Sequence, residues 1–235
     1  MAAADTLSTV AFTGYGIVVV TGLAFTYYAL QNYAHDRMEG YDDFWGYLTY
    51  LGMAFAAFGG FGVWRVAGGG TVARAFADVS LLFGIAFLTF SMREVYYNSA
   101  LAPAPEEREM SLERLRRLEF GFVVVIAIEW LVVMLIDQPG VVATVKGLGA
   151  LGFAAYGVTF SERLESLAHG TALDTLRRHL LLVLVCATGV AAADLVAFVA
   201  PSAIAESVFY VFLVLLGGLL VPPTIRLQQS VAGLS

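Results

Sequence analysis

The chain has 235 residues, of which 59% are hydrophobic and 14% are charged, and its formal net charge at pH 7 is -6. A mean hydropathy of +0.78 lies well beyond the balance of apolar and charged residues in soluble domains. This composition excludes an ordinary soluble protein, and the sequence has no basic footprint for nucleic acid. Apolar runs of membrane-spanning length recur from end to end, so we predict one integral-membrane domain over residues 1–235.

The predicted fold is an all-α bundle of seven transmembrane helices, because a helix of roughly 20 residues crosses the hydrocarbon. Polar or turn-forming stretches separate the apolar runs, such as "HDRMEGYDD" after the first and "AGGG" after the second. The spans are predicted at about 8–34, 43–66, 71–97, 119–137, 140–160, 179–200 and 203–226. The fifth span is rich in glycine, which favours close approach of neighbouring helices at Gly147, Gly149, Gly152 and Gly157.

Arginines concentrate in two of the links between spans. One lies between the third and fourth spans and the other between the fifth and sixth, while the alternate links carry few basic residues. By the positive-inside rule, these links face the cytoplasm, which places the N-terminus outside and the C-terminus inside. The arginines concerned are Arg108, Arg114, Arg116 and Arg117 in the first link and Arg163, Arg177 and Arg178 in the second.

The link before the fourth span is predicted to become helical at its end. Ser111 is placed to cap a helix, and Glu113 and Arg117 are spaced to pair across one turn. One interpretation is a solvated extension of the fourth helix. The other is a surface on which Arg108, Arg114, Arg116 and Arg117 dock a cytoplasmic or membrane signalling partner.

Four charged residues lie at a common depth inside different spans. Counting 1.5 Å per residue places them roughly 9 to 12 Å below the outer surface, with two further charges about a turn above. A charge at membrane depth is costly unless it is paired or hydrated, so such residues normally face the bundle interior. The layer contains Asp78, Glu129, Lys146 and Asp194, with Arg74 and Glu206 above it.

Two interpretations of this layer remain open. In the first, the six residues form a buried polar network that serves as a ligand site or as a proton or ion site. In the second, each residue is paired or reaches the interface separately, and Lys146 has a stem long enough to do so.

In the inner half, Arg93, Glu94, Tyr96 and Tyr97 are interpreted as interface anchors. No catalytic or metal-binding residues are assigned, and Cys186 is expected to be a packing residue.

Two stretches resemble microbial opsins of the archaeal type. They are "AFAAFGGFGVW" with the following "ARAFADVSLL", and the ending "PSAIAESVFYVFLVLLGGLL". The resemblance implies a seven-helix fold in which Arg74 and Asp78 line an outward proton path. The last helix lacks the lysine that binds retinal in that family, so covalent retinal is not expected and the cofactor stays unknown.

Lys146 is the chain's single lysine, and every other fixed positive charge is an arginine. This scarcity of lysine, with the acidic balance, resembles the proteomes of salt-loving archaea.

Three classes of function follow for a multi-pass protein of the cell membrane. The first is a non-enzymatic sensor or signalling or assembly subunit that uses the outer polar layer. The second is a proton or cation transporter or channel, in which intramembrane carboxylates carry the ion. The third, an intramembrane enzyme, is the least favoured because the sequence has no zinc motif and no serine elbow. The sequence leaves open whether the chain forms homo-oligomers.

Overall fold

A computed structural model describes the chain except for residues 1, 36–41, 99–110, 137, 169–171 and 235. The described residues are helical apart from short turns, with no strand among them. The helices are α1 (Ala2–His35), α2 (Asp42–Val66), α3 (Gly70–Asn98), α4 (Leu112–Leu135), α5 (Pro139–Ala168), α6 (Ala172–Ala192), the 3-10 helix η2 (Ala193–Phe198), α7 (Ser202–Leu219) and α8 (Val221–Leu234).

Seven stretches in the described part of the chain are long and apolar enough to cross a membrane, as the composition predicted. The first three agree with the predicted spans to within a residue at each end, at Leu7–Ala34, Asp43–Val66 and Gly70–Tyr97. The chain is therefore a multi-pass membrane protein by its helices. We call the end of the bundle where α1, α3, α5 and α7 begin the amino end, and the opposite end the carboxyl end.

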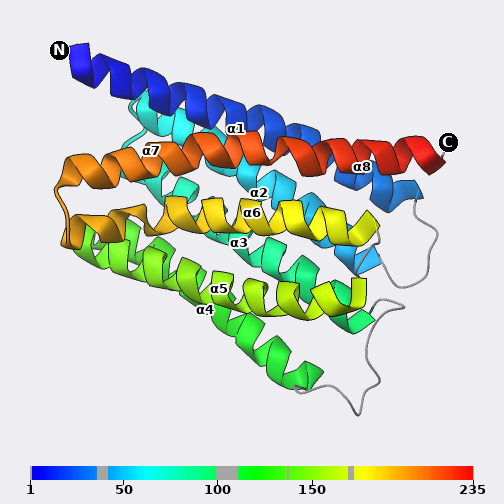
Figure 1. The fold of residues 1–235 in the computed structure, drawn as a ribbon. Coiled ribbons are helices and arrows are strands. Elements are labelled where there is room, and N and C mark those ends of the chain that lie inside the picture. The colour runs from blue at the N-terminus through cyan, green and yellow to red at the C-terminus, as the bar shows by residue number, and fades with distance from the viewer. Residues whose placement is uncertain (1, 36–41, 99–110, 137, 169–171, 235) are drawn as a thin grey trace.

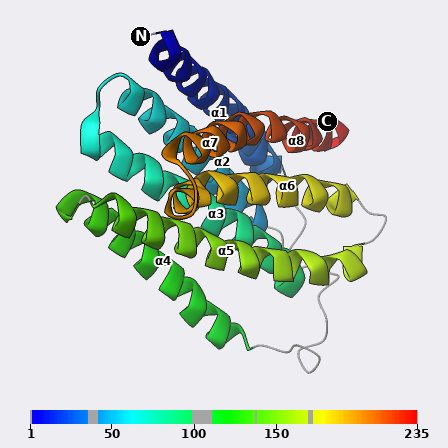
Figure 2. The same cartoon turned by 60° about the vertical axis from the view of Figure 1, so that its left-hand side comes forward.

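The helices form a bundle around α3 (Figures 1 and 2). In the most apolar stretch of α3, 72% of the residues are buried, compared with 22% in α4 and 28% in α1. Helix α3 contacts α2, α4, α5 and α6, whereas α7 packs on α6 and returns to α1. Because α3 lies at the centre, its charged residues are the ones that need oppositely charged partners on neighbouring helices.

Glycines shape the connection and the contact between the first helices. Gly68 and Gly70 adopt φ of 103° and 60° in the short link from α2 to α3, a conformation that side chains disfavour. Gly22 on α1 and Gly52 on α2 lie where a Cβ would meet the partner helix backbone at 2.8 Å. Close packing of α1 on α2 therefore depends on the missing side chains.

The last two predicted spans differ from the structure at their ends. The sixth span was predicted as one helix to about residue 200, but α6 tightens into η2 at Ala193, a common way to end a helix before a proline such as Pro201. The seventh was predicted as one helix, but it divides into α7 and α8 at Leu220. Pro222 and Pro223 then occupy the first turn of α8, where their missing N–H groups cost least. Helix α8 continues the line of α7 along α1 (Figure 1).

Candidate functional site

Lys146 is the centre of an ion-pair network in the amino-end half of the bundle. Its Nζ donates to Asp78 Oδ1 at 3.2 Å and to Asp194 Oδ2 at 2.7 Å. The lysine side chain is 3% exposed, so it does not reach the interface alone. These two bonds join α5 to α3 and to η2. The two bonds thus place three residues that are far apart in the chain side by side.

Arg74 completes this network on α3. Its Nε lies 3.8 Å from Asp78 Oδ2, and the two residues are one helical turn apart on the same face. The Arg74 side chain is 26% exposed and that of Asp78 is 5% exposed. Asp78 therefore has a cation on either side, Arg74 towards the surface and Lys146 in the interior. We call Arg74, Asp78, Lys146 and Asp194 the Lys146 network.

Local backbone features place Asp194 beside the lysine. Gly147, the residue after Lys146, packs against Leu195, and a Cβ on it would lie 2.6 Å from that side chain. The 3-10 segment η2 begins at Ala193, so Asp194 sits in the tightened turn. Gly149 and Gly157 also face close neighbours, at Val125 and Thr89, whereas Gly152 has open space.

Glu129 on α4 lies next to this network but is not bonded to it. The residue is 0% exposed, and neither carboxyl oxygen has a hydrogen-bond partner among the described residues. Its carboxyl group interacts electrostatically with Asp78, Lys146 and Arg74. A carboxyl group in this position is stable only if its charge is removed or compensated.

Glu206 stands apart from the other five predicted residues. It is exposed on the second turn of α7, and none of the ion pairs found in the described part of the chain connects it to the Lys146 network. Sequence counting gave its depth but not the rotation of α7. The structure therefore assembles five of the six residues and leaves this one outside.

The network is partly exposed at the amino end of the bundle. The side chain of Asp194 is 43% exposed there. Directly below it, α3 contributes buried apolar residues such as Leu81, Leu82 and Ile85. Further along, the rings of Phe122 and Phe153 pack with centroids 4.2 Å apart. Apolar packing thus separates the network from the carboxyl-end half.

A second buried cluster lies in that half, and the sequence interpretation missed it. Arg93 and Glu94 were predicted to be interface anchors, but they are 6% and 3% exposed. Arg93 Nε donates to Glu119 Oε1 at 2.8 Å and its Nη1 to Glu94 Oε2 at 2.6 Å, while Tyr156 Oη donates to Glu119 at 3.2 Å. The sequence signal for this cluster was Glu119 at the predicted start of the fourth span, because its charge is opposite to that of Arg93. Reading it required the mutual register of α3, α4 and α5.

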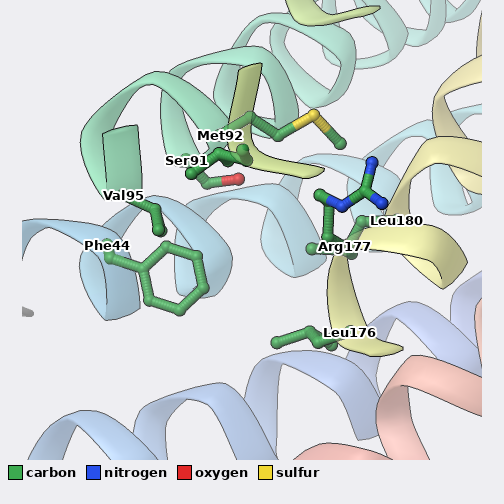
Figure 3. A pocket seen from close by; sticks show the side chains of 8 residues that line it. Phe44, Ser91, Met92, Val95, Leu176, Arg177 and Leu180 are labelled. Atoms are coloured by element: carbon green, nitrogen blue, oxygen red, sulfur yellow. The ribbon is translucent and has the colours of Figure 1, made fainter. Parts of the chain in front are cut away.

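The start of α6 holds a third group of charges. Arg177 was counted as a loop arginine, but it is 7% exposed and donates to Asp174 at 2.8 Å and to the Ser161 carbonyl at 3.0 Å. These bonds attach α6 to the end of α5. A cavity of about 20 Å³ adjoins Arg177 and Ser91 (Figure 3), which is room for about one water molecule.

The predicted partner-docking arginines are only partly described. Arg108 lies outside the described residues, and nothing is described of the Arg116 side chain. Arg114 and Arg117 are exposed on the first turns of α4, and Arg117 pairs with Glu113 as predicted. Ser111 caps this helix by accepting from the Arg114 N–H at 3.4 Å, which was also predicted.

No family model matches the chain, and no match was found among the curated proteins or the solved structures. Among the described residues, no group of three or more His, Cys, Asp and Glu side chains is placed to hold a metal ion.

Proposed function

We propose that this chain is a non-enzymatic sensor or signalling or assembly subunit of the cell membrane, and that the Lys146 network is its responsive element. The observation that carries the proposal is the pair of bonds from Lys146 Nζ to Asp78 and Asp194. They tie three helical elements together at a point that is exposed on one side and sealed by apolar packing on the other. Such a junction suits a switch that is reached from one face of a membrane.

Helix α6 connects this junction to the other end of the bundle. Asp194 lies two residues after the end of α6, in η2, and Asp174 and Arg177 lie in the first turns of α6, where Arg177 donates to the Ser161 carbonyl of α5. Weakening the Lys146–Asp194 bond frees one end of this continuous element. We propose that the resulting shift of α6 is read at the carboxyl end.

The proposal includes an orientation and a family likeness. The arginine bias puts the N-terminus outside, so that the Lys146 network faces the exterior and the starts of α4 and α6 face the cytoplasm. A partner would dock there, beside Arg114 and Arg117. The opsin resemblance is kept as a likeness of the bundle without covalent retinal in the last helix, where Gly217 packs against Ile17 of α1.

The test is a distance measurement between the middle of α6 and helix α8 in the full chain, reconstituted in lipid nanodiscs. Spin labels are placed at Leu182 on α6 and Gln228 on α8, both exposed, with Cys186 replaced by alanine. The Lys146→Met variant is expected to shift the distance distribution between the labels. The matched control is Glu206→Gln, which removes an exposed charge at the same end and is expected to leave the distribution unchanged. An unchanged distribution in Lys146→Met would refute the switch.

A second candidate is a proton or cation transporter, favoured by the Arg93–Glu119 cluster on the same helices. Asp78 and Arg93 are about 22 Å apart along α3, so a pathway between them would have to cross the apolar packing. Ion flux into liposomes under a gradient separates the candidates. Flux that Asp78→Asn and Asp194→Asn abolish would favour the transporter over the sensor.

A further inference from the structure

Glu129 is the residue of this site whose charge the structure leaves uncompensated. It is fully buried, and both of its carboxyl oxygens lack a hydrogen-bond partner among the described residues. The Tyr15 hydroxyl and the Trp130 indole nitrogen nearby in this half are also buried without a hydrogen-bond partner in the described part of the chain. An ionised carboxylate is strongly disfavoured in such surroundings unless a cation or a donor compensates it.

The charged groups that are bonded to one another in the network balance without Glu129. Helix α3 presents Arg74 and Asp78, α5 presents Lys146, and η2 presents Asp194 to the network. These are two cations and two carboxylates. Arg65, exposed at the end of α2, also interacts with Asp194, and the Tyr15 hydroxyl of α1 interacts with Asp78 and Lys146.

An ionised Glu129 would therefore add a negative charge that these bonds do not offset, and its carboxyl group interacts electrostatically with Asp78. Two carboxylates in one low-dielectric site do not readily ionise together. Asp78 and Asp194 each accept a hydrogen bond from the Lys146 ammonium, whereas Glu129 accepts none among the described residues. The proton that neutralises the site consequently belongs on the remaining carboxylate.

We propose that Glu129 carries one exchangeable proton, and that a proton is the ligand to which the Lys146 network responds. This inference rests on the proposed function, since it names the ligand of the same site. The proton enters from the amino end, where Asp194 and Arg74 are partly exposed. Loss of the proton places a second negative charge beside Asp78 and competes for the Lys146 ammonium, which weakens its bond to Asp194.

Infrared difference spectroscopy on the full chain in nanodiscs tests the assignment. A protonated carboxyl group absorbs in its own C=O stretching region and shifts in heavy water when its proton exchanges. The wild type at neutral pH is expected to show such a band, shifted in heavy water. Glu129→Gln is expected to lose it, Glu129→Asp to keep a displaced band, and Glu206→Gln, the matched exposed carboxylate, to leave it unchanged.

Two results would overturn the proposal: no exchangeable carboxyl band in the wild type, or a wild-type band that persists in Glu129→Gln. Glu129→Asp retains the carboxyl group, so it keeps the assignment testable if the glutamine variant fails to fold. The outcome is independent of the helix-shift measurement. A Glu129 band without movement of α6 would refute the sensor and leave the proton site, whereas movement without the band would refute the proton site alone.

Discussion

Removing the ammonium group of Lys146 isolates the contribution of the network to the stability of the bundle. Lys146→Met keeps most of the aliphatic stem and deletes the group that binds Asp78 at 3.2 Å and Asp194 at 2.7 Å. Asp78 then stays 5% exposed with Arg74 at 3.8 Å as its remaining cation. Asp194 is 43% exposed and can be hydrated instead.

The expected loss of unfolding free energy follows from this difference in exposure between Asp78 and Asp194. Breaking a buried ion pair by removing one partner costs about 3–5 kcal/mol because the other charge is left uncompensated. Asp194 can be hydrated, and Arg74 remains near Asp78 as a cation. We therefore expect a loss of unfolding free energy at the lower end of this range, about 3 kcal/mol. For a chain of this size, roughly 2–4 °C per kcal/mol corresponds to a fall in Tm of about 6–12 °C.

Thermal unfolding in nanodiscs measures this loss, and a double variant checks its cause. Lys146→Met with Asp78→Asn removes both charges of the buried pair, so the double variant should recover much of the stability that the single variant loses. Arg114→Met, which removes an exposed charge, is the control and should change stability by less than about 0.5 kcal/mol. A loss below about 1 kcal/mol in Lys146→Met, or simple additivity in the double variant, would refute the reasoning.

Three further predictions concern the rest of the bundle. Arg93→Met should destabilise by about 3 kcal/mol in the same assay, because the buried Glu94 and the half-buried Glu119 lose their cation; equal effects in Arg93→Met and Arg114→Met would contradict the buried cluster. Gly147→Val should separate η2 from α5 and shift the spin-label distance as Lys146→Met does, while Gly152→Val, which has open space, should not; the reverse order would contradict the packing. Added retinal followed by borohydride should give no visible band fixed to Lys146, because two carboxylates hold its amine; a fixed band would restore a covalent chromophore.

Local sequence patterns predicted the spans and several of their details. Hydropathy gave seven membrane-length helices, and spacing gave the Ser111 cap and the Glu113–Arg117 pair. The pairing of Arg74 with Asp78 also follows from spacing, since residues four apart share a helix face. All of these predictions depend on residues within one helical turn of each other or on the hydropathy summed over about 20 residues.

Tertiary structure decided which charged residues meet. By counting, Glu206 lies about a turn above Asp194, as Arg74 does, yet Glu206 is exposed whereas Arg74 joins the Lys146 network. Arg93 resembled an interface anchor until Glu119 of the next helix was placed beside it. Depth along a helix depends on residue number alone and is therefore set by the sequence. The direction of a side chain depends on the rotation of its helix, which is fixed by packing against helices from distant parts of the chain.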